Sequence, residues 1–375
     1  MKRILTQLKN KYVDHFGYHT DRKLVVIESD DWGSIRMPSR EVFERLKATG
    51  DTPEKDPFLS NDSLECEEDL QVLFDLLGSV FDQKGNHPII TANFAMANPD
   101  FDEIDYNNGI YHYEPFYRTY DRYFGNKNVL ELVKEGHRAG FMLPQLHCRE
   151  HLNVNRWMRD LRAGKEDTRL AFENKTIGIG ASFEKKNLFG YMDAFNTDCT
   201  TAEELDKLLQ DAHDIFSDSF GFRSDSFVAS CFVWDDGLEK SLIKQGIQHI
   251  QSSPWQYKPV GKHYEYKLRR ALRYTGQKGK FGHLYSVRNC VYEPAYNQNP
   301  QDCVKNCFEA VQHSFAVKKP AIISSHRLNY VSAINPQNRE NNLLGLKALL
   351  KAILLNYPDA EFISSAELFA IMERH

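Results

Sequence analysis

The sequence predicts an α/β protein built on a distorted (β/α) barrel, complete or incomplete, of about seven strands with loop insertions. Short apolar segments of strand length alternate with stretches of helical periodicity along the chain. Several of these segments are apolar throughout, which is typical of parallel strands buried on both faces. The 375 residues fit one such unit, because barrels of this type often exceed about 250 residues as one domain.

The first predicted strand, residues 23–28, reads Lys-Leu-Val-Val-Ile-Glu and leads directly into Ser-Asp-Asp-Trp-Gly. The third predicted strand brings His147 to its carboxyl end. Strands are predicted at 23–28, 87–95, 140–146, 222–229, 249–252, 284–291, 321–324 and 360–363. Helices are predicted at 129–138, 202–216, 235–245, 301–313 and 342–355.

We expect a single catalytic domain over residues 1–375, with insertions near 101–124 and 164–197 that interrupt the alternation. Long loops inside a compact domain are usually lids, binding loops or disordered insertions, and we expect both to lie around one mouth of the barrel. The aromatic residues of the first insertion could form a platform for sugar rings or close over a core. They are Tyr106, Tyr111, Tyr113, Phe116, Tyr117, Tyr120 and Tyr123.

Composition narrows the class of partner. The net charge is −5 with acidic and basic residues mixed along the chain, so no basic footprint for nucleic acid is present. No run approaches the roughly 18 apolar residues of a membrane span, and charges interrupt residues 1–18, unlike a secretory signal. The seven cysteines include no Cys-x-x-Cys pair. We therefore expect a cytoplasmic protein with no nucleic-acid or membrane partner and with reduced thiols.

Polar residues follow three of the predicted strands. They are Asp30 and Asp31 after the first, His147 and His151 after the third, and Ser-Ser-His-Arg at 324–327. In a parallel barrel the carboxyl ends of strands meet on one face, where active sites lie. Two imidazoles and one carboxylate suit zinc or a similar divalent ion with a position open for water. The sequence therefore predicts a metal site on Asp31, His147 and His151, with Asp30 as a candidate base.

These positions resemble the motifs of the polysaccharide deacetylases, carbohydrate esterase family 4, whose fold is a distorted (β/α) barrel. Their Thr-Phe-Asp-Asp-Gly motif is similar to residues 28–33, Glu-Ser-Asp-Asp-Trp-Gly. Their His-Ser/Thr-x-x-His motif is matched by His147 and His151, and their Leu-x-His motif by His326.

The resemblance implies a metal-dependent hydrolase that removes an acyl group, most simply N-acetyl, from a carbohydrate. It implies that Asp30 is the base, that Asp31 and the two histidines hold one divalent metal, most simply zinc, and that His326 is the acid for the leaving group. The partner it implies is an N-acetylated glycan. It leaves the sugar and the oligomeric state open.

One family motif is altered. Residues 222–227 keep the arginine of Arg-x-Pro-Tyr/Phe-Gly, Arg223, without its proline and glycine. The resemblance implies that Arg223 orients Asp30, whereas the backbone donor to the oxyanion has no counterpart. Glu293 or Trp255 could take the place of the family's aspartate and tryptophan, which orient the histidine acid.

Several alternatives stay open at the sequence level. Cys148 is a rival metal ligand, ranked below His151 because adjacent residues on a strand point to opposite faces. Asn93 and Asn98 could bind a substrate hydroxyl or stabilise the turn at Pro99. Two rival functions are a glycoside hydrolase that uses two carboxyl groups without metal, and an inactive carbohydrate-binding protein on the same scaffold.

Overall fold

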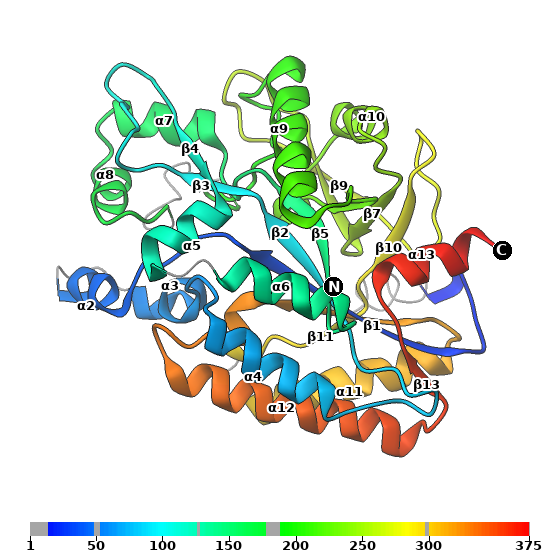
Figure 1. Cartoon of the computed structure of the whole chain (residues 1–375). Coiled ribbons are helices and arrows are strands. Elements are labelled where there is room, and N and C mark those ends of the chain that lie inside the picture. The colour runs from blue at the N-terminus through cyan, green and yellow to red at the C-terminus, as the bar shows by residue number, and fades with distance from the viewer. Residues whose placement is uncertain (1–13, 49–52, 126–127, 178–187, 297–299, 375) are drawn as a thin grey trace.

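Parallel strands form the centre of the molecule in the computed structural model, which describes residues 14–48, 53–125, 128–177, 188–296 and 300–374. The strand order is β10-β7-β6-β5-β2-β1-β12-β11, and β13 pairs with the start of β1 (Figure 1). The strands are β1 (Lys23–Trp32), β2 (Ile90–Ala95), β5 (Met142–Cys148), β6 (Ser226–Val228), β7 (His249–Ser252), β10 (Leu284–Val287), β11 (Cys290–Val291), β12 (Ala321–His326) and β13 (Ala360–Phe362).

The sheet curls into an incomplete barrel. Its two edge strands, β10 and β11, are separated in the chain only by Arg288 and Asn289. Because an extended residue advances the chain by at most about 3.6 Å, the two edges must lie close together. A cavity of about 490 Å³ lies at this seam, where Val287 and Val291 face α11 (Pro300–Ala316). The predicted fold class is confirmed.

The predicted strand 284–291 is two strands, one at each edge of the sheet. Arg288 interrupts it because its side chain bonds to buried carboxylates, and Asn289 because its side chain bonds to the backbone of Pro320 and Ile322. This division adds one strand, so that the eight predicted ranges become the nine strands of the described sheet.

Helices surround the sheet (Figure 1). All five predicted helices are present, as α6 (Asn128–Arg138), α9 (Ala202–Phe220), α10 (Asp236–Lys244), α11 and α12 (Pro336–Asn356). Seven further described helices were not predicted: α2 (Arg40–Ala48), α3 (Pro57–Asn61), α4 (Glu67–Gly78), α5 (Phe116–Phe124), α7 (Val154–Arg162), α8 (Glu166–Glu173) and α13 (Ser365–Glu373). Four 3₁₀ turns complete the described helices: η1 (Pro53–Lys55), η2 (Ser230–Phe232), η3 (Pro294–Tyr296) and η4 (Arg327–Asn329).

Local sequence defines both ends of α9. Thr201 and Glu204 form a reciprocal capping box at its start, which satisfies free backbone N–H groups of the first turn. Gly221 ends the helix in the left-handed conformation, with φ of 78°, which glycine adopts without steric cost.

Both faces of β1 are buried, and this alternation sets the interior of the barrel. Val25 and Ile27 belong to the large core between the sheet and the outer helices. Leu24 and Val26 belong to a smaller core that α13 covers. Because strand residues alternate between faces, the series that begins with Leu24 and Val26 continues inward at 28 and 30. Carboxylates therefore succeed apolar side chains along the inside of the barrel.

The first insertion mainly builds core. Besides β3 (Ala97–Pro99), which pairs with β4 (Tyr113–Pro115), the region contains α5, whose Phe116 and Tyr120 are buried in the large core. Tyr106 and Tyr111 pack around Trp157 in a separate cluster. These contacts favour the core alternative over a sugar platform. The second insertion contains α8, and its residues 178–187 lie outside the described residues.

A second antiparallel pair, β8 (Trp255–Pro259) and β9 (Leu268–Leu272), lies outside the barrel sheet. Among the helices that the structure describes, none is long and apolar enough to cross a bilayer.

Candidate metal centre

A β-bulge aims two consecutive carboxylates of β1 into the barrel. Between Ser29 and Trp32, β1 holds one residue more than the facing part of β2. Asp31 lies in this irregular stretch and has φ of 73°, a left-handed conformation that is uncommon outside glycine and concentrates at functional sites. A bulge redirects side chains locally. Asp30 thus points inward by ordinary alternation, and Asp31 joins it because of the bulge.

His147 points inward from β5. Leu146 and Cys148, its neighbours on the strand, enter the large core, so the imidazole between them faces the interior. The Nδ1–H group of His147 donates to the carbonyl oxygen of Val228, at 2.8 Å. This bond leaves the lone pair of Nε2 free, which is how metal-binding histidines are usually oriented.

His151 completes the group from the loop between β5 and α7. The Nε2 atoms of His147 and His151 each lie 3.3 Å from Oδ1 of Asp31. Ligand atoms at the corners of a zinc tetrahedron, each about 2.1 Å from the ion, are about 3.4 Å apart. Within the residues that the structure describes, Asp31 Oδ1 and His147 Nε2 are buried without a hydrogen-bond partner, so the site has the spacing and the unused donor atoms that one ion requires.

The protonation states suit metal binding. Burial, with help from Arg36 and His147, lowers the pKa of His151 to about 3 although Asp31 opposes the shift, so its imidazole is neutral at pH 7. Burial alone would raise the pKa of Asp31, but His151 and Arg36 hold it well below its usual value. Neutral imidazole and ionised carboxylate are the forms that coordinate metal.

Cys148 is not among the residues that could share this ion. Its side chain is fully buried in the large core, on the face of β5 opposite to His147. Burial raises the pKa of its thiol well above the usual value, so it remains protonated. The preference for His151 over Cys148 as a ligand agrees with this geometry.

Asp30 lies beside the triad and is held by Arg288. The two terminal nitrogens of Arg288 donate to the two oxygens of Asp30, at 2.6 and 2.7 Å, and its Nε donates to Glu28 at 2.7 Å. Asn93 Nδ2 donates to Asp30 as well, at 2.8 Å. Burial alone would raise the pKa of Asp30, but Arg288 lowers it to about 2, so the carboxylate stays ionised.

The prediction that Arg223 orients Asp30 is wrong, because Arg288 does so. Arg223 Nη2 bonds instead to Nδ1 of His213, at 2.8 Å, and to the carbonyl oxygen of Gln245. Arg223 precedes β6, at the amino end of the strand, whereas the site gathers at the carboxyl ends. The signal for Arg288 was present in the sequence as the one charged residue of the predicted strand 284–291.

His326 ends β12 across from Asp30, with which it is paired in the register of β1 and β12. Its Nδ1 bonds to Glu293 Oε1 at 2.5 Å, and its Nε2 lies 4.0 Å from Asp30 Oδ2. Burial alone would lower the pKa of His326, but Glu293, with Asp31 and Asp30, raises it to about 9. Glu293 rather than Trp255, which lies in β8, contacts this histidine.

Buried charges of both signs surround the site. The carboxylates are Glu28, Asp30, Asp31 and Glu293, and the cations that contact them are Arg36, Arg288 and protonated His326. Burial raises the pKa of Glu28, although Arg288 opposes the shift. Buried charge is costly unless it is paired, so a cation beside Oδ1 of Asp31 would be favourable.

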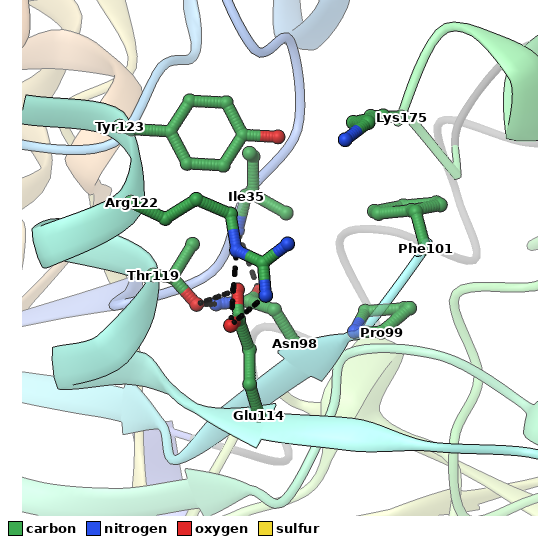
Figure 2. A pocket seen from close by; sticks show the side chains of 9 residues that line it. All are labelled: Ile35, Asn98, Pro99, Phe101, Glu114, Thr119, Arg122, Tyr123 and Lys175. Atoms are coloured by element: carbon green, nitrogen blue, oxygen red, sulfur yellow. Dashed lines mark hydrogen bonds and ion pairs between the residues drawn. The ribbon is translucent and has the colours of Figure 1, made fainter. Parts of the chain in front are cut away.

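The two asparagines named from the sequence have structural partners. Asn98 accepts from the backbone N–H of Ile35 and donates to the carbonyl oxygen of Gly33 and to Thr119. Figure 2 shows it beside the ion pair of Arg122 and Glu114, in a cavity of about 10 Å³, room for one water. None of the metal-site residues lines this cavity. Asn98 therefore stabilises the loop after β1 rather than the turn at Pro99, and Asn93 bonds to Asp30 and Gln251.

A scan against models of known families gives no match, and neither does a search of curated proteins. Among solved structures, the chain is similar to a probable polysaccharide deacetylase from Pseudomonas aeruginosa PAO1, at 8% identity over 96% of both chains and with a TM-score of 0.49. It is similar to the Xyl-CE4 domain of a multidomain xylanase from the hindgut metagenome of Trinervitermes trinervoides, at 9% identity over 94% of this chain and 92% of that one, with a TM-score of 0.40.

A further match is a 4-alpha-glucanotransferase from Thermococcus litoralis, at 9% identity with a TM-score of 0.48. The alignment covers 93% of this chain and 40% of that longer chain. The names of two of these three proteins mention polysaccharide deacetylase or CE4, the family whose motifs the sequence resembles. Because similar barrels support different reactions, the matches assign no reaction to this chain, and its function must be argued from the site.

Proposed function

We propose that the protein is a metal-dependent hydrolase that removes an acyl group, most simply N-acetyl, from a carbohydrate. The observation that carries this proposal is the buried group of Asp31, His147 and His151, spaced for one ion, with Asp31 Oδ1 and His147 Nε2 unpartnered among the described residues, beside a carboxylate and a protonated histidine. When bound, a divalent cation such as zinc supplies Lewis-acid chemistry, since it lowers the pKa of water toward 7 and polarises an acyl carbonyl.

Asp30 is the base in this proposal. It accepts a proton from water while the water oxygen bonds to the acyl carbon and the carbonyl electron pair moves onto the acyl oxygen. The pKa of about 2 makes Asp30 a weak base by itself, so it can act only on a water that is already acidified. Arg288 and Asn93 hold the carboxylate in one orientation, which supports a positioned rather than a mobile base.

His326 is the acid. With a pKa of about 9 it carries its proton at neutral pH, and Glu293 holds Nδ1 so that the Nε2–H group faces the space near Asp30. As the carbonyl re-forms and the carbon–nitrogen bond breaks, Nε2 donates this proton to the departing nitrogen. The products are acetate and the free amine of the sugar.

The first test combines metal analysis with acetate release from N-acetylated glucosamine oligosaccharides. Wild-type protein should bind one zinc ion and release acetate, and a chelator should abolish the release. Asp31→Asn keeps the side-chain shape but removes the charge, so zinc affinity should fall by more than the roughly 10- to 100-fold typical of losing an outer partner.

Arg223→Gln is the matched control, because Arg223 bonds to His213 and Gln245 and not to the site. It should retain both zinc and activity. Protein that stays free of metal after reconstitution would contradict the proposal. Release of sugar rather than acetate, insensitive to chelator, would indicate a glycoside hydrolase instead, and glycan binding without any hydrolysis would indicate a binding protein.

A further inference from the structure

Three buried arginines, Arg36, Arg288 and Arg327, surround the site. In Arg288 and Arg327, every side-chain nitrogen donates a hydrogen bond to a carboxylate. Arg288 donates from Nε and both terminal nitrogens to Glu28 and Asp30. Arg327 likewise donates from all three nitrogens to two carboxylates. Hydrogen bonds from every nitrogen are expected of a buried guanidinium, which has only N–H donors and no acceptor.

Arg36 differs from both. Its residue is 5% exposed, and its one carboxylate contact, Nη2 to Asp31 Oδ2, is long at 3.3 Å. Nη1 contacts the thioether sulfur of Met192, a weak acceptor, and Nε is buried with no hydrogen-bond partner in the described part of the chain. A buried donor without an acceptor destabilises the folded protein, so these groups are costly unless a ligand uses them.

The position of Arg36 says which ligand atoms it could reach. Asp31 turns Oδ1 toward the two histidines and Oδ2 toward Arg36, so the guanidinium and the candidate metal site share one carboxylate. The guanidinium also lies over the ring of Phe58, at 5.1 Å, and the same ring packs edge-on against His326, at 5.6 Å. Arg36 thus borders the space between the donor triad and the proposed acid.

We propose that Arg36 donates hydrogen bonds to the acyl oxygen of the substrate as that oxygen gains negative charge. When the water oxygen bonds to the acyl carbon, the carbonyl pair moves onto this oxygen, and when the carbon–nitrogen bond breaks, the pair re-forms the carbonyl. Arg36 keeps its proton throughout. This inference rests on the proposed function, and it gives a side-chain donor to a chain whose residues 222–227 lack the backbone donor motif.

The alternative is that Arg36 only orients Asp31. Arg288 shows how this protein orients a carboxylate, with two short bonds to the same group at 2.6 and 2.7 Å. Arg36 makes one long contact with Asp31, its Nη1 has only the weak acceptor of Met192, and its Nε has no partner among the described residues. The contrast favours a ligand-binding role.

The test uses acetate, which carries the acyl oxygen of the proposed product, and measures its binding to zinc-loaded protein by calorimetry. Arg36→Gln should weaken acetate binding by about 10- to 100-fold, the loss expected for a charge-assisted hydrogen bond. Zinc binding should be unchanged or tighter, because a neighbouring cation has been removed. Arg36→Lys should show an intermediate loss of acetate affinity, since it keeps the charge without the planar fork.

Met192→Leu is the local control, because it changes the neighbour of Arg36 at similar volume and should leave acetate binding intact. Acetate affinity that is unchanged in Arg36→Gln would overturn the inference alone. Weaker zinc binding in that variant would show that Arg36 positions Asp31 and would overturn it too. A wild-type protein that binds no zinc would contradict the proposed function itself, which is a separate result.

Discussion

At the scale of single residues, the two carboxylates that follow one another in β1 do different work because their partners differ. Asp30 is saturated by Arg288 and Asn93, whereas Asp31 keeps one buried oxygen that has no hydrogen-bond partner among the described residues. In the proposed function the saturated carboxylate is the positioned base and the unsaturated one is the metal ligand. Hydrogen-bond satisfaction therefore distinguishes two adjacent residues of the same type.

The protonation of His326 yields a prediction about pH. Its pKa of about 9 lies above the usual 6.5, so it is protonated at neutral pH and loses its proton as pH rises through about 9. Glu293→Gln removes the carboxylate bonded to Nδ1, so the pKa of His326 should fall by about 1–3 pH units. NMR titration of the imidazole in metal-free protein measures this directly.

The ion pair of His326 and Glu293 also makes the free energy of unfolding depend on pH. Because the folded pKa is raised, the stabilisation is fully present below pH 6.5 and is lost as pH rises through about 9. Glu293→Asp should retain part of the shift. A titration of His326 that does not move in Glu293→Gln would show that Glu293 is not its main electrostatic partner.

At the scale of elements, strand alternation decides which neighbours in sequence share the site. In β5, His147 faces the barrel interior while Leu146 and Cys148 face the core. In β1, alternation by itself would send one of two adjacent aspartates to the wrong face, and the bulge with positive φ at Asp31 corrects this. Both strands are irregular beside the site, since the register of β5 with β2 also shifts between Leu146 and Cys148, where His147 lies.

Cys148→Ala tests the orientation of β5. The thiol packs in the core and lies outside the donor group, so zinc stoichiometry and affinity should not change. Stability should fall by roughly 0.5–3 kcal/mol, as is usual for trimming a core side chain. Metal analysis and urea denaturation of metal-free protein measure the two effects, and His151→Ala is the matched variant that should lose zinc. Loss of zinc in Cys148→Ala would make the thiol a ligand after all.

At the scale of the whole molecule, buried ion pairs tie distant segments together beneath the site. Arg327 directly follows β12. It donates hydrogen bonds to Asp62 and Glu65, which lie between α3 and α4. Glu65 also accepts from the backbone N–H of Gly33, in the loop after β1, and from Tyr120 of α5. The ends of β1 and β12 are thus joined through the carboxylate of Glu65.

Arg327→Met is expected to destabilise the fold by about 3–5 kcal/mol, because it leaves two fully buried carboxylates without their cation. Arg22→Gln is the control, since the ion pair of Arg22 with Glu361 is partly exposed and should contribute less than about 1 kcal/mol. Urea denaturation of both metal-free variants measures the difference. Equal midpoints for the two variants would show that the buried network adds no more than a surface pair.

Much of the fold and of the metal site could be predicted because the signals are local. Apolar runs and helical periodicity located the strands and the longer helices, and the rule that parallel strands gather their carboxyl ends brought Asp31, His147 and His151 together. These inferences need only the residues within one segment and the direction of the chain. The ranking of Cys148 below His151 followed from alternation in the same way.

Only the tertiary structure decided which groups complete the site. Arg288 rather than Arg223 contacts Asp30 because the sheet curls. The curl brings the edge strands β10 and β11 close together, and the side chain of Arg288, between them, points to Asp30. The unused donors of Arg36 depend on what surrounds it in space, since no sequence pattern records a missing partner. Charges and hydrogen bonds are settled by long-range contacts, whereas strand and helix formation is largely encoded by neighbours in the chain, and this is why the elements were predictable and the partners were not.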